Sequence, residues 1–310
     1  MLYRVRQQIN RSYFSWRTRA ILSTPPLSAA PDAACAIHTM LSQRDVPMYL
    51  PAIKSLLRHA PPVRVVVHSD GSLDADAVAL VRRHVPGATI VAADDADRRA
   101  ASALGTESYL FRWRRHDASW RRVIDTELWC ETPRRIVVDP DVIVLHRPDA
   151  LVDWIARGDR PFLFGQPPTP GSPAGSPGFI QTIFRERIRS LAARLNLPAE
   201  FPQGATSGFY GCGRELSLAS IERVLRAGEA EGFPMAQWGS EQCTVIYLLQ
   251  ASGGTRLDPL RYLNYDPTCD PLLAEACAVH FYGTYRYHRG IYPRLAARIA
   301  AGLQHADRSL

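Results

Sequence analysis

The chain has 310 residues, of which 46% are hydrophobic and 22% charged, as in an ordinary globular protein with a large core. No run approaches the roughly 18–20 consecutive apolar residues of a membrane-spanning helix, so we expect no integral membrane insertion. The first thirty residues are basic without an apolar core, and we expect no secretory signal peptide. The formal net charge is +7, but five arginines and no acidic residue stand in the first twenty positions. The rest of the chain is nearly neutral, so the sequence predicts no nucleic-acid partner.

Six cysteines are scattered along the chain, and none forms a Cys-x-x-Cys pair. This spacing excludes the common zinc-finger and dithiol redox motifs. We therefore expect reduced, mostly buried cysteines in a cytoplasmic protein.

Residues 1–32 are predicted to form a basic N-terminal tail. The segment mixes aromatic residues with its arginines and ends in a proline-rich stretch. Two structures fit this mixture: a solvated tail, or a short helix lying on an anionic membrane with its arginines reaching the headgroups. The second would give the protein a peripheral membrane contact.

From residue 33 onward, strand-like and helix-like segments alternate. Apolar runs predict strands at 34–39, 63–68, 89–92, 135–144, 161–165 and 278–282. Helical spacing predicts helices at 48–59, 74–84, 104–131 with a break near residue 117, 180–195, 216–230 and 241–249. The acidic run at 94–97 is expected to be a solvated loop, and the proline- and glycine-rich stretch at 165–178 a lid or an insertion. This alternation predicts an α/β domain with a largely parallel sheet.

Two carboxylates stand at Asp139 and Asp141, between runs of apolar β-branched residues. Charges inside a sheet are too costly to leave unpaired, so the pair must lie where a buried strand emerges. A turn at Pro140 would aim both carboxylates at one point and create an oxygen-rich site for Mg²⁺ or Mn²⁺; the alternative is a solvated turn. The position after a strand favours the metal site, because ligands of open α/β sheets bind beyond the carboxyl ends of strands.

His280 ends a short apolar strand and is followed by Gly283 and Arg286. Its imidazole could complete a metal's ligand set, while a glycine lets the backbone approach a diphosphate and an arginine binds phosphate oxygens. Taken alone, a histidine in an apolar strand is more often a core residue with a satisfied hydrogen bond.

Together these segments resemble the GT-A-fold glycosyltransferases, especially glycosyltransferase family 8, over about residues 33–298. The family has a strand ending in Asp-x-Asp and a late His-Phe-x-Gly-x-x-(Lys/Arg) segment, matched here at 139–141 and 280–286. Three further matches follow the family's order: Trp120–Val123 before the Asp-x-Asp strand, Thr206–Tyr210 against an acceptor-side Asn-Ser-Gly strand, and Ser240–Gln242 against an acidic-Gln pair that starts a helix. The resemblance implies a GT-A (Rossmann-like nucleotide-diphospho-sugar transferase) fold. It would be a single α/β domain over 33–302 with a mixed, mainly parallel sheet, followed by a C-terminal tail at 303–310.

The resemblance also implies roles for eleven residues. The ligands of Mn²⁺ (or Mg²⁺) would be Asp139, Asp141 and His280. The residues binding the nucleotide and its phosphates would be Thr39, Arg122, Gly283 and Arg286. The catalytic residues beside the donor sugar and the acceptor hydroxyl would be Glu241 and Gln242, with Ser207 and Gly208 on the acceptor side.

The implied reaction moves a hexose from a nucleotide-diphosphate sugar, with a UDP-sugar favoured, to a hydroxyl of a saccharide, a lipid-linked sugar or a protein, with retention of configuration. The chain departs from the family at Ala205-Thr206, where an Asn usually precedes Ser-Gly, and at Arg286, where Lys is commoner. Two other functions stay open: a non-catalytic sugar-nucleotide-binding protein and a sugar-phosphate nucleotidyltransferase. The phosphate-binding loop of P-loop kinases, the nucleophile elbow of α/β-hydrolases and the dinucleotide-binding fingerprint of dehydrogenases are all missing from the sequence.

Overall fold

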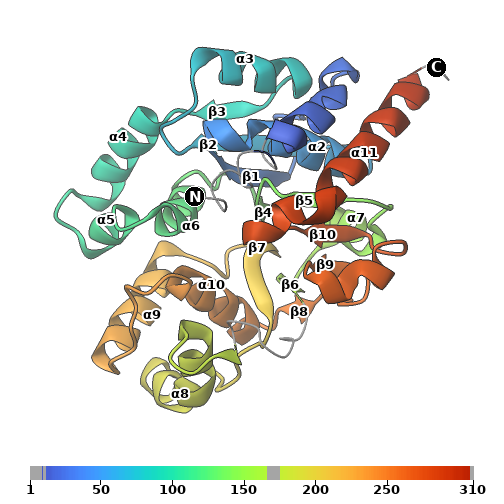
Figure 1. The fold of residues 1–310 in the computed structure, drawn as a ribbon. Helices are drawn as coiled ribbons and strands as arrows, with labels where there is room; N and C mark the ends of the chain where they lie inside the picture. The colour runs from blue at the N-terminus through green and yellow to red at the C-terminus, as the bar shows by residue number, and fades with distance from the viewer. Residues whose placement is uncertain (1–8, 10–11, 166–174, 308–310) are drawn as a thin grey trace.

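A computed structural model describes residue 9, residues 12–165 and residues 175–307 (Figure 1). Most of the loop predicted at 165–178 therefore lies outside the described residues.

A central sheet organises the described chain. Its strands are β1 (Cys35–Leu41), β2 (Arg64–Ser69), β3 (Thr89–Val91), β4 (Arg134–Val138), β6 (Phe162–Gly165), β7 (Ala205–Cys212) and β8 (Thr255–Arg256). They follow the order β3-β2-β1-β4-β7-β6-β8. Among the described pairs, β7 runs antiparallel to both β4 and β6, and the other four are parallel. The mixed, mainly parallel sheet predicted from the sequence is confirmed.

A second, three-stranded sheet lies beside the first and has the order β5-β10-β9. Its strands are β5 (Val142–Val144), β9 (Tyr262–Asn264) and β10 (Ala278–His280). The prediction of one interrupted strand over 135–144 is therefore wrong, because β4 and β5 belong to different sheets. Pro140, in the turn between them, has no N–H with which to continue a strand ladder.

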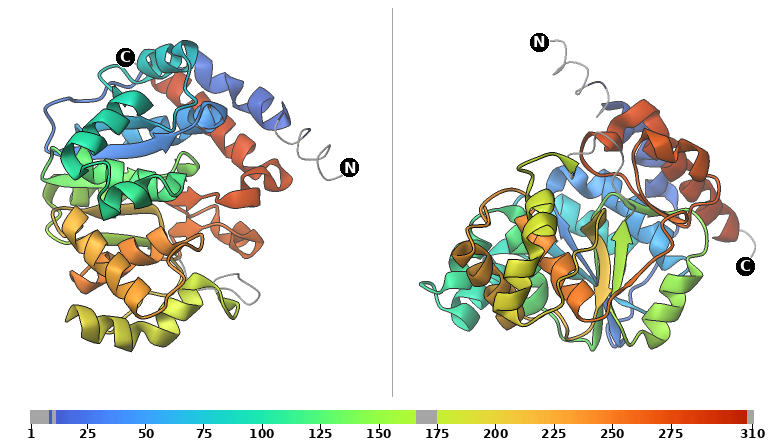
Figure 2. Two further views of the ribbon diagram at one scale, coloured as in Figure 1. Left: turned by 90° about the vertical axis from the view of Figure 1, so that its left-hand side faces the viewer. Right: turned by 90° about the horizontal axis from the view of Figure 1, so that it is seen from below.

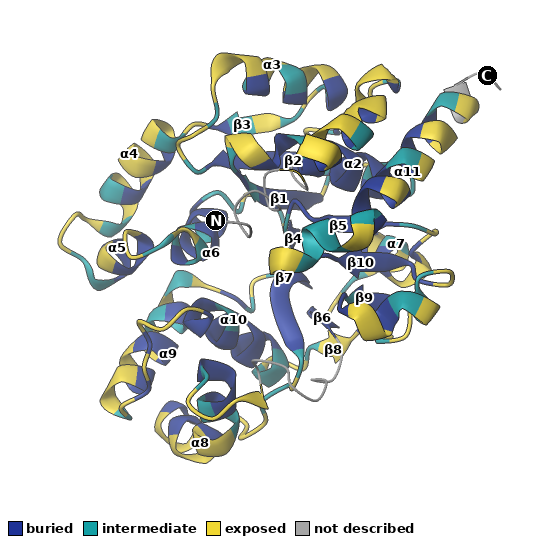
Figure 3. Cartoon of the chain, in the orientation of Figure 1, coloured by how far each residue is buried: buried dark blue, intermediate teal, exposed yellow. Residues whose placement is uncertain are grey.

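Helices cover both faces of the central sheet, and its strands are largely buried between them (Figure 3). One face packs against α2 (Val46–Leu57), α3 (Ala75–His84), α7 (Asp149–Arg157) and α11 (Ile291–Asp307). The other packs against α4 (Ala93–Leu104), α5 (Tyr109–Arg114), α6 (Ala118–Leu128), α8 (Ile180–Leu195), α9 (Leu218–Ala230) and α10 (Ser240–Ala251). Short 3₁₀ segments are η1 (Arg19–Ser23), η2 (Gln43–Asp45), η4 (Pro267–Leu272) and η5 (Gly283–Gly290).

Several helix boundaries follow directly from capping side chains. Asp74 accepts a hydrogen bond from the backbone N–H of Ala77, 2.8 Å away, and Asp117 accepts from Ser119 and Trp120, which places the predicted break between α5 and α6. The acidic run at 94–97 is not the solvated loop that we expected. It lies at the start of α4, and Asp94 and Asp95 are in the first turn, where acidic side chains interact favourably with the helix N-terminus.

Both ends of the described chain pack against the body. Residues 12–18 are helical, and Phe14 and Ile21 are buried in the same core as α2 and α11. The ammonium group of Lys54 on α2 donates hydrogen bonds to the Thr24 hydroxyl at 2.5 Å and to the carbonyl of Pro25 at 2.7 Å. This part of residues 1–32 thus differs from a solvated tail, and α11 continues past the predicted boundary at 303, with Leu303 buried. None of the described helices is long and apolar enough to cross a membrane.

Candidate functional site

A cleft of about 490 Å³ opens at the carboxyl ends of β1 and β4. Besides these strand ends, its walls come from α6, the strand β7, the start of α10, the end of β9 and the beginning of η5. Nine of the eleven residues predicted from sequence line it: Arg122, Asp139, Ser207, Gly208, Glu241, Gln242, His280, Gly283 and Arg286. The fold thus brings together segments that are more than 160 residues apart in sequence.

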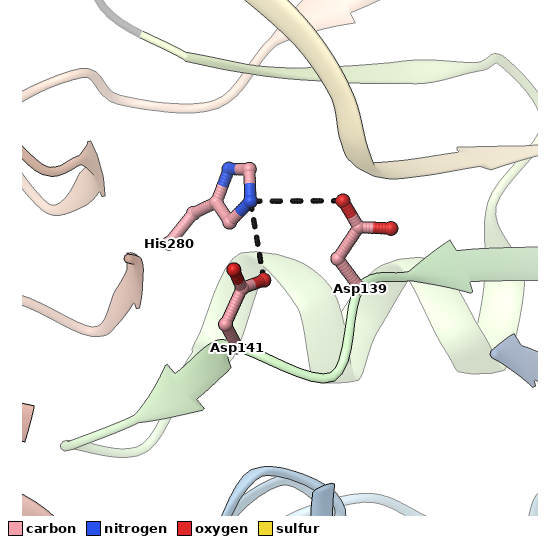
Figure 4. A group of neighbouring side chains, drawn as sticks. All are labelled: Asp139, Asp141 and His280. Atoms are coloured by element: carbon pink, nitrogen blue, oxygen red, sulfur yellow. Dashed lines mark ion pairs between the residues drawn. The ribbon is translucent and has the colours of Figure 1, made fainter. Parts of the chain in front are cut away.

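The side chains of Asp139, Asp141 and His280 point toward one another (Figure 4). Asp139 and His280 line the cleft, whereas Asp141 is buried behind them and is not among the described lining residues. The His280 Nε2 atom lies 3.3 Å from Oδ1 of Asp141 and 3.7 Å from Oδ2 of Asp139. All three ligand atoms lie within 4.8 Å of one another, so the group could hold a metal ion. Asp141 is fully buried, and its Oδ1 atom has no hydrogen-bond partner in the described structure.

Backbone pairing in both sheets fixes these three side chains. The turn at 139–141 connects the sheets: the N–H of Asp139 donates to the carbonyl of Gly208 on β7 at 2.7 Å. On the other side, β10 runs antiparallel to β5 with His280 opposite Val142, and the N–H of Phe281 donates to the carbonyl of Asp141 at 3.1 Å. The histidine is therefore held beside the Asp141 carboxylate by strand register.

Gly208 leaves the space that the His280 ring occupies. A Cβ atom at this position would lie 2.4 Å from Cε1 and 2.8 Å from Nε2 of His280. Since real Cβ atoms essentially never approach so closely, any larger residue would displace the ring. A glycine at position 208 is therefore needed to leave room for the His280 ring, which the sequence could not show.

Arginines pair with both aspartates. On one side, Arg122 from α6 donates to the Asp139 carboxylate and, at 2.7 Å, to the hydroxyl of Ser207. On the other, Nε of Arg286 from η5 donates to Oδ2 of Asp141 at 2.6 Å. Burial alone would raise the pKa of Asp141, but the neighbouring His280 and Arg286 together bring that pKa below its ordinary value. The carboxylate is thus kept ionised despite its burial.

Glu241 and Gln242 begin α10 and face β7. The Gln242 side-chain oxygen accepts hydrogen bonds from the Thr206 hydroxyl at 3.0 Å and from the N–H of Ser207 at 3.2 Å. Glu241 lies 3.7 Å from the Arg122 guanidinium, and burial raises the pKa of its carboxyl while Arg122 opposes that rise. Thr206, which stands where the family has Asn, uses its hydroxyl to hold Gln242.

Thr39 differs from its predicted place. It is 1% exposed and is not among the described residues that line the cleft; instead it faces a small internal cavity with Tyr49 and Val138. Successive side chains of a strand point to opposite faces, so the neighbouring Met40 lines the cleft instead. The predicted register was shifted by one residue.

The structure adds cleft residues that sequence reasoning missed. Asp45, on η2, lines the cleft and accepts a hydrogen bond from Ser42 at 2.6 Å; an acidic side chain at the start of a helix could have signalled it. Phe179 and Trp238 form an aromatic pair at the cleft, with ring centroids 6.2 Å apart, and Trp238 is 70% exposed. These two precede different helices, and no spacing in the sequence relates them.

No protein-family profile and no curated protein matches the sequence. Among solved structures, the chain aligns with the glycosyltransferase GlyE of Streptococcus pneumoniae TIGR4 at a TM-score of 0.51 and 11% identity, over 90% of this chain and 64% of that one. The apo form of GlyE gives the same score and identity over 89% and 64%. The chain has the GT-A glycosyltransferase fold. The resemblance predicted from the sequence is confirmed at the level of the fold, which is all that identity this low shows.

This GT-A chain spans just under two thirds of the length of GlyE. A looser alignment, at a TM-score of 0.48 and 13% identity, is with the galactosyltransferase LgtC in complex with donor and acceptor sugar analogs. It covers 86% of this chain and 95% of that one.

Proposed function

We propose that the protein is a metal-dependent glycosyltransferase that transfers a hexose from a nucleotide-diphosphate sugar to a hydroxyl acceptor. The observation that carries the proposal is the group formed by Asp139, Asp141 and His280, two of which line the cleft of a GT-A fold. The donor we favour is a UDP-sugar, and the acceptor is a hydroxyl of a saccharide, a lipid-linked sugar or a protein.

The three side chains suit a divalent ion such as Mn²⁺ or Mg²⁺. Ligands about 2.1 Å from a hexacoordinate ion lie about 3 Å apart when adjacent and about 4.2 Å apart when opposite. The observed separations of 3.3 Å and 3.7 Å from Nε2 of His280 fall within this range. Oδ1 of the buried Asp141 accepts no hydrogen bond and has Nε2 of His280 as its neighbour at 3.3 Å, so a cation held between the two atoms would pair with both. When bound, the ion would offset the negative charge that develops on the departing diphosphate.

Arg286 and Gly283 would bind that diphosphate. Arg286 already reaches the Asp141 carboxylate, and η5 places it at the cleft together with Gly283. Gly283 has a φ of +57° and nothing within 4 Å of its missing side chain, which leaves its backbone open to a phosphate. The guanidinium would exchange a carboxylate for phosphate oxygens, both of which it binds well.

On the opposite wall, Arg122, Glu241 and Gln242 would orient the donor sugar and the acceptor. In a retaining transfer the bond from the anomeric carbon to the diphosphate breaks, and the acceptor oxygen bonds to that carbon on the same face. The leaving phosphate takes the acceptor's proton, so no side chain is required as a base. Because Gln242 is anchored to Thr206 and Ser207, it presents a fixed amide to the cleft.

The test combines nucleotide binding with turnover. Thermal unfolding is followed with UDP, GDP, ADP or CMP, each with Mn²⁺, Mg²⁺ or EDTA, for the wild type, Asp141→Asn and the surface control Asp149→Asn. A ligand at a hundred times its Kd stabilises by about 2.7 kcal/mol, which is several degrees for a chain of this size. We expect a metal-dependent shift with one nucleotide in the wild type and the control, absent in Asp141→Asn. No shift with any nucleotide would refute the proposal.

One observation favours a second candidate, a sugar-nucleotide-binding protein without transferase activity. Each aspartate of the turn is already paired with an arginine, so its negative charge is balanced without a metal ion. This candidate predicts nucleotide binding without release of the nucleoside diphosphate from any sugar donor. Detecting released UDP that disappears in EDTA would eliminate it, whereas release of pyrophosphate from an NTP and a sugar phosphate would indicate a nucleotidyltransferase.

A further inference from the structure

The first described helix has two apolar faces, and only one of them is used in packing. Phe14, Thr18 and Ile21 are all buried, at 4%, 2% and 1% exposure. The Phe14 ring stacks on Tyr292 with centroids 5.2 Å apart and meets Tyr287 edge-on at 5.6 Å. This face attaches the segment to η5 and α11, as Figure 2 shows for the dark blue and red elements.

The opposite face presents large apolar side chains to solvent. Tyr13 is 41% exposed and Trp16 60%, three residues apart on one face of the helix at 12–18. Ile9, at 62%, precedes this helix, and Leu22, at 40%, follows it on η1. Six large apolar side chains are exposed in the described residues, and these are four of them. Exposed apolar side chains are therefore concentrated on one short segment rather than scattered singly over the surface.

Positive charge surrounds this face. At roughly 100° per residue, Arg17 flanks Tyr13 on one side and Arg19 flanks Trp16 on the other. The first twenty residues hold five arginines and no acid, and thus most of the net charge of +7. Aromatic side chains bordered by arginines have the composition of a helix that lies in a membrane interface, with its apolar side among acyl chains and its cations at the headgroups.

We propose that this surface, formed by Ile9, Tyr13, Trp16, Arg17 and Arg19, docks the protein onto an anionic lipid bilayer. Burial of the opposite face fixes the orientation, because Phe14 and Ile21 cannot turn toward lipid without leaving the core. Tyr13 also contacts the end of η5, since a Cβ atom on Gly290 would lie 3.0 Å from its ring. The docking surface thus adjoins the element that carries Gly283 and Arg286 into the cleft. The proposal does not depend on the transferase activity.

Vesicle sedimentation of the full chain tests the proposal, with vesicles of phosphatidylcholine alone or with 30% phosphatidylglycerol. We expect binding to the anionic vesicles that weakens with salt. The pair Arg17→Gln and Arg19→Gln should weaken it by about fivefold for each arginine removed. The control pair Arg157→Gln and Arg160→Gln, exposed at and just after the end of α7, should leave binding unchanged.

The apolar contribution is tested separately. Trp16→Ser should reduce binding by at least tenfold, whereas Leu260→Ser, at an equally exposed position of 63%, should not. Point variants are preferable to deleting residues 1–30, because the deletion would also remove the buried Phe14 and Ile21, and unchanged melting of each variant shows that it is folded. Equal binding of Trp16→Ser and Leu260→Ser would overturn the proposal. The proposal would also be overturned if the protein bound neither vesicle and light scattering showed a dimer that depends on Trp16. That result would assign the surface to a second copy of the chain.

Discussion

Gly208→Ala should impair metal binding while the rest of the fold stays intact. The change adds one methyl group to β7, where residue 208 has no unusual backbone conformation and can keep its strand hydrogen bonds. The methyl carbon would lie 2.4 Å from the His280 ring, whereas ordinary contacts begin at 3.4 Å. The pairing of β7 with β6 shifts register at this point, but the Gly208 carbonyl accepts a hydrogen bond from the N–H of Asp139 at 2.7 Å and the Gly208 N–H donates to the Thr206 hydroxyl. We therefore expect the ring rather than the backbone to move, by about 1 Å.

That displacement is large for a metal ligand. Bond lengths at metal sites are fixed to within about 0.2 Å, so a ring displaced by about 1 Å no longer coordinates properly. Loss of an outer partner of a metal ligand already lowers affinity by about 10- to 100-fold, and we expect Gly208→Ala to lower Mn²⁺ affinity by about 100-fold. Asp139 and Asp141 stay in place, so residual weak binding should persist.

The assay is titration of the protein with Mn²⁺ in the presence of saturating nucleotide, followed by electron paramagnetic resonance of the free ion. Gly175→Ala is the control, because a Cβ there meets nothing within 4 Å. Circular dichroism without metal should be unchanged for both variants, and Gly208→Ala should lose no more than the roughly 1–3 kcal/mol expected for one extra methyl group in a packed core. An Mn²⁺ affinity of Gly208→Ala within twofold of the wild type would refute the steric argument.

Three further predictions concern Arg122, Lys54 and Trp238. Arg122→Ala leaves two acids without their cation and should cost about 3–5 kcal/mol of unfolding free energy at pH 7.5. Burial raises the pKa of Glu241, so near pH 5 its carboxyl takes up a proton more readily and then needs no cation beside it; this contribution to stability is lost as the pH rises. Denaturant titration should therefore show a smaller loss of unfolding free energy for Arg122→Ala at pH 5 than at pH 7.5. Equal losses would contradict this reasoning. Burial lowers the pKa of Lys54 to about 8, so above that pH the folded chain binds fewer protons than the unfolded one. The free energy of unfolding of the wild type, relative to that of Lys54→Met, should therefore rise between pH 8 and pH 10. Urea unfolding of both proteins at the two pH values tests this. Trp238→Ala should raise the KM for the acceptor by up to about tenfold and leave the nucleotide-dependent melting shift unaltered; a lost shift would instead place Trp238 on the donor side.

Local patterns of residues were enough to locate most of the strands and helices. Apolar runs located β1, β2 and β3, and the cap at Asp74 located the start of α3, because these features depend on neighbours within a few residues. The acidic run of α4 was missed because its charges resemble those of a loop, and only Ala96 and Ala100 of its central turns are buried. The Asp-x-Asp turn was visible because its two carboxylates interrupt a run that otherwise reads as continuous strand.

The way in which distant segments meet could be seen only in the folded chain. β5 belongs to the second sheet and pairs with β10, and the register of this pairing places His280 beside Asp141. The place of Thr39 depended on which strand face meets α2, and the partners of Arg122 and Arg286 depended on two sheets closing around one cleft. The buried and exposed faces of the first helix could likewise be distinguished only from the contact between Phe14 and Tyr292. Long-range pairing of this kind is set by the packing of the whole core, which no local pattern of residues encodes.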